Sequence, residues 1–571
     1  MIGVAVKGLK GGPVANSQYD AVIVGAGHNG LVCALYLARA GWKTLVLERN
    51  EEIGGAVMSG EITRPGFVHD LYSMNQNLFL GSPVYAELAD DLKRHGLSYK
   101  TAPRPYSNVF PDGTSLRIYQ DQDRTLELLR DHSPRDAEGF QRLHERYKAF
   151  GEAFLPIYGA PLPSAKATWH LVKATRSRGL NELADLTQII LSSTRELGDA
   201  YFETGEMKAL VATWGMHLDF GPDVSGGAMF PFLEVYTDME QGMSVVEGGA
   251  SRMPEALAGL LEEYDGEVRT YSEVGKILTE DGRVTGVRVT SGERISARRA
   301  VVANLTPKVL FGGLLPEELV PGHFRRRVKR YEYGPGTMMV HLALSGRPRW
   351  RAGEDLDEFA YVHVAPYVED LAETYTESLN GLLPENPLLI VGQTSAVDPS
   401  RTPGDEEVLW IQVRTLPSEI RGDAAGEIPA RTWEDAKEPF ADRVMRKLEE
   451  YAPGIGDLVL ERVVFSPEDL ERHNPNLVGG DSVGGSHHLR QNFIFRPFPG
   501  WSNYKMPLEG LYMVGAATWP GAGTNATSGY LAAKEILRSR VLRDRLVKAG
   551  AALGTAGAAA LLLSRAARRR G

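Results

Sequence analysis

Cysteine is almost absent from this chain, because its 571 residues include Cys33 alone. One thiol excludes an intramolecular disulfide, a CxxC redox pair and a metal site built from several cysteines. The sequence therefore predicts no metal centre and a reducing compartment, with a cytoplasmic location as the simplest interpretation.

Long apolar runs and an excess of positive charge are missing too. The first 20 residues hold no sustained apolar segment and no clear cleavage signature, so we expect a flexible leader instead of a secretion signal. The 63 basic and 73 acidic residues leave a formal net charge of -10, which gives no electrostatic basis for binding nucleic acid. With 43% hydrophobic residues, the chain can still bury substantial cores.

The apolar stretch near the C-terminus is short. Residues 549–564 are rich in alanine and glycine, and RAARRRG follows them. The stretch is shorter than the roughly 20 apolar residues of a membrane-spanning helix. Two interpretations stay open: a terminal helix with a basic tail, or peripheral attachment in which the arginines face anionic lipid.

A strand, a glycine turn, a helix and a second strand follow one another near the N-terminus. The apolar run at 21–24 predicts a buried strand, and GAGHNG follows it directly. LVCALYLARAG has the apolar spacing of a helix, and TLVLE at 44–48 predicts the next strand. This order is that of a Rossmann-type dinucleotide-binding unit.

The residues of the turn have physical roles in such a unit. Gly25 permits a tight turn, Gly27 lets the backbone approach a pyrophosphate, and Gly30 lets helix and strand pack closely. The helix N-terminus offers free N–H groups to phosphates. Glu48 lies 18 residues after Gly30, where it can accept hydrogen bonds from a ribose diol. The other turn residues predicted to contact the cofactor are Ala26, His28 and Asn29.

Three further features favour FAD over NAD. The pair Gly54-Gly55 gives a second close approach of the backbone to the cofactor. Residues 248–304 predict a helix followed by antiparallel strands, with hairpin turns at DG and SG. Residues 510–537 predict a strand, a glycine-rich loop and a final helix.

These stretches resemble the glycine-pair flavoproteins, and among them the phytoene-desaturase-like FAD-dependent oxidoreductases. The matching segments are VGAGHNGLVCALYLARAGWKTLVLERNEEIGGAV, GGASRMPEALAGLLEEYDGEVRTYSEVGKI and FRPFPGWSNYKMPLEGLYMVGAATWPGAG. The resemblance is strongest to the branch of the carotenoid ketolases and the animal pyridine nucleotide-disulphide oxidoreductase domain-containing protein two. It spans nearly the whole chain and is specific for the fold and for FAD, but much less so for the substrate.

The resemblance implies further cofactor contacts. Arg49 would lie near the adenine, and Val274 would offer it backbone contacts. Gly515 and Ala516 would lie beside the pyrophosphate and the ribityl chain. The start of the final helix would direct N–H groups at the flavin ring. The residues predicted there are Asn525, Ala526 and Thr527.

Two positions depart from the family pattern. Many members carry an arginine after the glycine pair, where this chain has Ala56 and Val57. The motif THPGGG of the family is TWPGAG here, with Trp519 at the usual histidine position. Trp519 either faces the substrate, which makes the site more apolar, or serves in packing.

The implied fold is α/β, with a Rossmann-type FAD-binding domain interleaved with a substrate domain of mixed sheet and helices. Residues 183–218 predict mostly helix, and segments at 337–345, 388–391 and 408–413 predict strands of the second sheet. The predicted FAD-binding domain comprises 18–85, 236–310 and 491–545, the substrate domain 86–235 and 311–490, and the tail 546–571.

Residues 156–179 combine apolar side chains with lysines and arginines. Such a basic amphipathic segment can lie on a membrane surface. Desaturases of the resembling family take lipid-soluble substrates from membranes in this general region. The alternative is an ordinary solvated helix face.

Candidate catalytic residues are few. TWGMHLDFGPD contains His217 and Asp219, and a glycine-rich loop contains His487, His488 and Arg490. Histidines can move protons or hold a polar end of a substrate. Adjacent histidines point in different directions on most backbones, so they do not form a metal pair. A purely structural role is the alternative for each of these residues.

The resemblance implies hydride transfer to FAD from a lipophilic isoprenoid or polyene, which desaturates the substrate. The reduced flavin would pass its electrons to oxygen, a quinone or another acceptor. Three alternatives remain: a carotenoid ketolase-type oxygenation, an amine or amino-acid oxidation, and a flavin-binding protein without catalytic activity.

Overall fold

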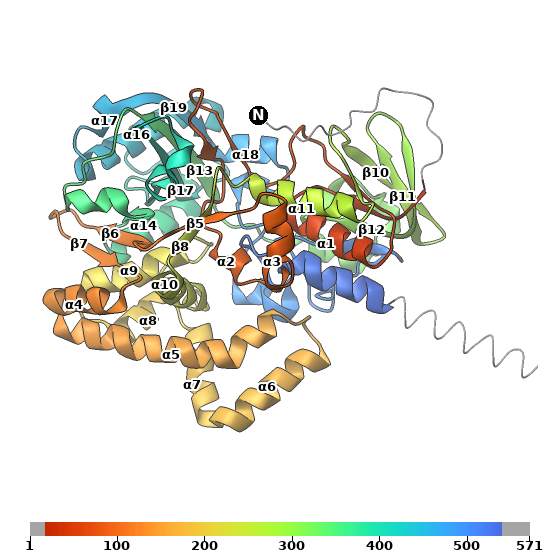
Figure 1. Ribbon diagram of the computed structural model, residues 1–571, viewed down its shortest axis with the longest axis horizontal. Coiled ribbons are helices and arrows are strands. Elements are labelled where there is room, and N and C mark those ends of the chain that lie inside the picture. Colours follow the sequence, from red (N-terminus) through yellow and green to blue (C-terminus); the bar gives the residue numbers. More distant parts are fainter. Residues whose placement is uncertain (1–17, 540–571) are drawn as a thin grey trace, which may run out of the picture.

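The computed structural model describes residues 18–539, so the predicted leader and the segment at 546–571 lie outside the described residues. The described chain is an α/β structure that contains two seven-stranded sheets. Figure 1 shows the sheet of β10, β11 and β12 on the right and the sheet of β13 and β17 on the left, with a layer of helices below them.

The first sheet contains the predicted strand, turn, helix and strand. Its parallel part has the order β20-β12-β1-β2-β9, and β11 and β10 continue it antiparallel beside the first half of β12. Val24, Leu47 and Ala303 pair at the same level, so three parallel strands end together. The strands are β1 (Gln18–Val24), β2 (Thr44–Leu47), β9 (Glu267–Arg269), β10 (Val274–Glu280), β11 (Arg283–Val289), β12 (Arg294–Ala303) and β20 (Leu511–Met513).

Helices cover one face of this sheet. The helix α1 (His28–Arg39) packs on α11 (Arg252–Glu263) through a buried cluster that also includes the final helix, which begins at Thr527. After α1 the chain turns at Gly41, whose φ of +80° suits glycine. The predicted helix and antiparallel strands of 248–304 are confirmed as α11 and β10–β12.

The second sheet has the order β19-β13-β17-β16-β14-β6-β7. The strands predicted at 337–345, 388–391 and 408–413 are confirmed as β13, β16 and β17. A helix, α16 (Trp433–Tyr451), covers one face through a shared apolar cluster. The strands are β6 (Tyr106–Val109), β7 (Ser115–Ile118), β13 (Gly336–Leu344), β14 (Tyr361–Val364), β16 (Leu389–Gly392), β17 (Glu407–Leu416) and β19 (Val459–Phe465).

The other face of the second sheet meets the helical layer. The prediction of mostly helix at 183–218 is confirmed, although a capping box at Ser193 and Glu196 starts a new helix inside it. Residues 229–241 form one helix across the predicted domain boundary at 236. The helices are α4 (Gln122–His132), α5 (Pro134–Tyr158), α6 (Ala165–Arg178), α7 (Leu180–Leu191), α8 (Thr194–Tyr201), α9 (Gly205–Gly215) and α10 (Met229–Gln241).

Shorter elements connect the layers, and α3 (Pro83–Arg94) packs on α11. None of the helices within 18–539 has the length and apolar character needed to cross a bilayer. The other helices are α2 (Asn77–Leu80), α12 (Pro307–Gly312), α13 (Gly322–Lys329), α14 (Val368–Leu379), α15 (Thr394–Val397), α17 (Ile455–Leu458) and α18 (Pro467–His473). The remaining strands are β3 (Ser59–Gly60), β4 (His69–Asp70), β5 (Tyr99–Ala102), β8 (Met243–Val246), β15 (Leu382–Leu383) and β18 (Gly422–Asp423).

Candidate functional site

A groove of about 310 Å³ lies where the parallel strands of the first sheet end. The chain leaves β1, β2, β12 and β20 at the same edge, which brings Gly25, Glu48, Asn304 and Gly515 to the groove. Of the residues predicted to contact a cofactor, those that line it are Gly25, Gly27, His28, Asn29, Glu48, Arg49, Gly54, Gly55, Ala56, Val274, Gly515 and Ala516.

The glycine turn is packed too closely for side chains. Gly25 has a φ of +94°, and a Cβ on Gly30 would lie 2.4 Å from the Gly25 carbonyl oxygen. A Cβ on Gly27 would lie 2.9 Å from Nδ2 of Asn304. The backbone therefore forms the wall of the groove here, with Gly30 behind the turn and outside the lining.

Asn304 is a residue of the site that the sequence reasoning missed. Its Nδ2 donates to the carbonyl oxygens of Gly25, at 3.3 Å, and of Gly27, at 3.4 Å. Its backbone N–H donates to Val24, the last residue of β1. The available signal was its position directly after a long apolar strand, since parallel strands end at a common edge.

Glu48 holds the turn from its other side. Its Oε2 accepts the N–H of Ala26 at 2.9 Å, and its Oε1 accepts the N–H of Asn50 at 3.0 Å. Each carboxylate oxygen keeps a further lone pair, so Glu48 can still accept hydrogen bonds from hydroxyl groups in the groove. Arg49 forms an ion pair of 3.7 Å with Glu273, and both are about half exposed at the groove.

The glycine pair contacts the glycine turn directly. The N–H of Gly54 donates to the carbonyl of Ala26 at 3.0 Å. A Cβ on Gly55 would lie 3.3 Å from the Cα of Gly27. The two glycine segments therefore form one continuous backbone surface for a ligand.

Two helix N-termini converge beside the turn. No side chain caps α1, whose first N–H groups therefore remain available to an anion. Oδ1 of Asn29 accepts the N–H of Gly529, in the first turn of the final helix, at 3.1 Å. Asn525 caps that helix by accepting the N–H of Thr527 at 2.9 Å. Asn525 and Thr527, with Ala526 between them, lie outside the lining of the groove.

The residues of the groove fit FAD. The closed glycine turn and the uncapped α1 suit a pyrophosphate, and Glu48 suits a ribose diol. A second segment of the wall comes from a distant part of the chain and was not predicted. Its residues are His473, Asn474, Pro475, Asn476 and Leu477, followed by Ser482 and Gly484.

Comparison with known proteins agrees with this site. The family described as flavin containing amine oxidoreductase matches residues 30–537. The chain belongs to this family. It is an FAD-dependent oxidoreductase, as the sequence predicted.

Relatives of this flavin oxidoreductase cover its whole length. Pyridine nucleotide-disulfide oxidoreductase domain-containing protein 2 of Rattus norvegicus is 29% identical, over 91% of this chain and 94% of its own. A limonene dehydrogenase polypeptide of Castellaniella defragrans has the same identity and coverage. The neurosporene-forming phytoene desaturase of Rhodobacter capsulatus is 26% identical, over 89% and 92%. The predicted resemblance to phytoene-desaturase-like oxidoreductases is confirmed.

A solved structure shares the fold. An oxidoreductase from Methanosarcina mazei superposes with a TM-score of 0.59 at 16% identity, over 91% of this chain and 99% of that one. This likeness supports the predicted α/β fold of the flavin oxidoreductase.

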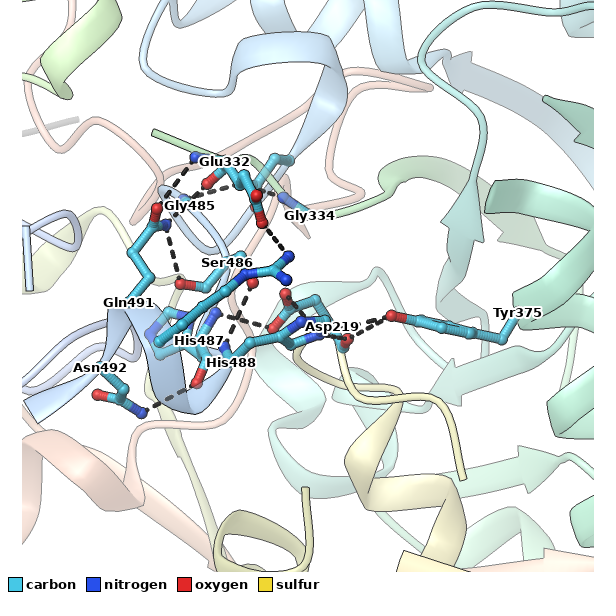
Figure 2. Close-up of polar contacts among 12 residues, drawn as sticks. Asp219, Glu332, Gly334, Tyr375, Gly485, Ser486, His487, His488, Gln491 and Asn492 are labelled. Carbon is cyan, nitrogen blue, oxygen red and sulfur yellow. Dashed lines mark hydrogen bonds and ion pairs between the residues drawn. The ribbon is translucent and has the colours of Figure 1, made fainter. Parts of the chain in front are cut away.

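The loop with the adjacent histidines is tied down by hydrogen bonds (Figure 2). The buried carboxylate of Asp219 accepts the N–H of His487 at 3.0 Å, and its carbonyl lies 3.0 Å from Nε2 of His488. Tyr375 donates to the same carbonyl at 3.2 Å. His487 accepts the N–H of Ala522 at 2.9 Å, and burial lowers its pKa well below the ordinary value. These contacts give both histidines a structural role in holding the loop.

The remaining candidates lie in different surroundings. Arg490 pairs with Glu332 at the surface. Trp519 is fully buried, and its indole N–H donates to the carbonyl of Ala160 at 3.0 Å. Its ring packs against Tyr158 and lies outside the lining of the groove. Packing therefore accounts for Trp519. Within residues 18–539, no three metal-ligating side chains form a cluster.

Proposed function

We propose that this oxidoreductase desaturates a lipophilic substrate of isoprenoid or polyene type, with FAD as hydride acceptor. The observation that carries this proposal is the apolar wall behind the groove. Ala56 and Leu477 line the groove and also pack in a large hydrophobic cluster with Met58, Tyr72 and Met74. A hydrocarbon chain can bury its surface there without leaving polar groups unpaired. The names of the limonene dehydrogenase and phytoene desaturase relatives agree with such substrates.

A chain of hydrogen bonds sets the protonation of His217. The Thr213 hydroxyl donates to Ala209, so it accepts from Nδ2 of Asn108, at 3.3 Å. Oδ1 of Asn108 then accepts from Nδ1 of His363 at 3.1 Å, which leaves Nε2 of His363 as an acceptor. His217 therefore donates through Nε2, 3.2 Å away, and keeps Nδ1 unprotonated.

His217 is the residue that we propose as proton acceptor. Burial and the nearby charge of Arg414 lower its pKa well below the ordinary value, which keeps the ring neutral. Arg414 donates to Ser482, which lines the groove. When bound, FAD takes a hydride from one carbon of the substrate. Nδ1 of His217 would accept the proton that leaves the neighbouring carbon, so that a double bond forms between them. Oxygen or a quinone would finally accept the electrons.

A surface patch on α6 and α7 fits delivery of the substrate from a membrane. Figure 1 shows these helices projecting from the body at the bottom of the view. Trp169, Leu180 and Leu191 are 59%, 73% and 54% exposed, and Lys173 and Arg176 lie on the same segment. Large apolar side chains among cations are typical of helices that lie in a lipid interface.

Oxidation of an amine is the second candidate, and a buried acidic pair favours it. Glu234 and Asp238 lie one turn apart on α10, and neither forms an ion pair within the described chain. Oδ1 of Asp238 accepts from Asn77 at 2.7 Å, and burial raises the pKa of Glu234 to about 7. The rings of Tyr106 and Tyr361 lie within electrostatic range. An ammonium group could neutralise this pair and contact the rings.

Anaerobic flavin bleaching tests these functions. The FAD-loaded protein is mixed with phytoene or limonene in detergent micelles, or with benzylamine, and the flavin absorbance is followed. Bleaching by the hydrocarbons alone, with a desaturated product, is the expected result. Bleaching by the amine alone would move the function to the second candidate. Oxygen in an aerobic product would indicate a ketolase, and no bleaching by any compound would indicate a protein without catalytic activity.

A variant tests the role of His217. His217→Gln keeps a polar side chain but removes the base, so bleaching by the hydrocarbon is expected to slow by about 10²-fold or more. The exposed His323→Gln is the matched control and should bleach at the wild-type rate. A fast His217→Gln variant would exclude this histidine as the proton acceptor and leave the overall reaction untouched.

A further inference from the structure

Arg496 is a fully buried arginine that binds only main-chain oxygens. Its Nε and Nη2 donate to the carbonyl of Ala516 at 2.9 and 2.7 Å, and its Nη1 donates to that of Ser486 at 2.9 Å. Longer hydrogen bonds of 3.1 to 3.4 Å reach three other carbonyls. These belong to Gly484, Gly485 and Gln491.

The charge of Arg496 has no ion-pair partner in the part of the chain that the structure describes. Other buried arginines differ, since Arg401 lies 2.9 Å from the carboxylate of Asp398 and Arg443 lies 2.7 Å from that of Asp423. Carbonyl dipoles satisfy the N–H groups of a guanidinium but leave its net charge uncancelled. A guanidinium also cannot release its proton to escape this cost.

The carbonyls that bind Arg496 belong to the wall of the FAD groove. Ala516 and Gly484 both line the groove, so the guanidinium lies directly behind the wall, on its protein side. Protein and not water fills this space, and a charge acts more strongly across such a medium than across solvent. The nearest region that can hold a compensating negative charge is therefore the groove itself.

We propose that Arg496 stabilises the negative charge that a bound flavin gains on reduction, and that it thereby raises the flavin reduction potential. Reduction adds two electrons and one proton to the flavin, so one negative charge remains. A fixed positive charge behind the wall favours this state over the neutral oxidised one without moving. The inference depends on FAD binding alone, and the identity of the substrate does not affect it.

The potential of the FAD-loaded protein tests this role without any substrate. Wild type and Arg496→Met are titrated against a redox dye of known potential, and FAD content is measured in the same samples. Loss of the charge is expected to favour oxidised flavin by about tenfold, which is about 30 mV lower for a two-electron couple. Sulfite gives a second readout, because its adduct leaves an anionic flavin, and its dissociation constant should rise by a similar factor.

Three variants separate charge from hydrogen bonding. Arg496→Lys keeps the charge but loses the planar fork, so its potential should stay near that of wild type. Arg462→Met removes a surface arginine and should change nothing. If Arg496→Met does not fold, Arg496→Gln takes its place. A wild-type potential in the neutral variants, or a Lys variant that falls as far as they do at full FAD content, would overturn the proposal.

Discussion

Gly529 tests whether the approach of the two helix N-termini shapes the FAD groove. A Cβ at this position would lie 2.1 Å from the carbonyl oxygen of Asn29. A carbon and a carbonyl oxygen in contact are normally about 3.3 Å apart. Gly529→Ala therefore forces the final helix and α1 apart by about 1 Å, and this also lengthens the hydrogen bond of 3.1 Å from Gly529 to Oδ1 of Asn29.

The cost of this change follows from the packing. Forcing an extra methyl group into a closed contact costs about 1 to 3 kcal/mol. Because α1 carries the glycine turn, part of this cost falls on the FAD-bound state. A loss of about 1.4 kcal/mol in binding is a tenfold weaker affinity. We therefore expect FAD to dissociate about tenfold or more readily, and the thermal midpoint of the FAD-loaded protein to fall.

FAD fluorescence gives the dissociation constant of the apoprotein, and differential scanning calorimetry gives the thermal midpoint. Gly346→Ala is the matched control, because a Cβ there meets no atom within 4 Å and the backbone lies outside the positive-φ region. This control should match wild type in both measurements. A Gly529→Ala protein with wild-type affinity and midpoint would refute the argument that this contact positions α1.

Three further predictions concern other parts of the molecule. Asn304→Leu removes both hydrogen bonds to the glycine turn, so FAD affinity measured by fluorescence should fall about tenfold, and an unchanged value would contradict the role of Asn304. Burial lowers the pKa of His69 to about 4 and of His363 to about 3, so both stay neutral in the fold while the unfolded chain takes up protons below pH 6.5. Their contribution to stability is complete above pH 6.5 and is lost as the pH falls, by about 1.4 kcal/mol each at pH 5.5; urea unfolding should show this loss, and His363→Asn should reduce it. Trp169→Glu with Leu171→Glu should weaken co-sedimentation with anionic liposomes if the patch binds lipid, and equal sedimentation would remove that proposal.

Local patterns account for what could be predicted of the FAD-binding unit. The spacing of Gly25, Gly27 and Gly30 reflects contacts within one turn and one helix, and these depend on residues close in the chain. Strand and helix periodicities are local too, which is why β13, β16 and β17 could be located. The cofactor followed from these elements together with the family resemblance.

Contacts between distant segments could not be predicted in the same way. Asn304 lies 279 residues from Gly25, and Asn29 lies 500 residues from Gly529, yet each pair forms a hydrogen bond. Trp519 occupies a motif position that suggested a view of the substrate, and only the packing of Tyr158 against it decides otherwise.

The amino-acid sequence by itself determined the Rossmann-type unit, its glycine turn and the acid that follows the second strand. It did so because backbone sterics and side-chain periodicity act over a few residues. The tertiary structure alone decided which side chains surround that unit, how His217 is protonated and where the charge of Arg496 lies. These properties depend on burial and on hydrogen-bond partners that come from remote parts of the chain, and no local pattern encodes them.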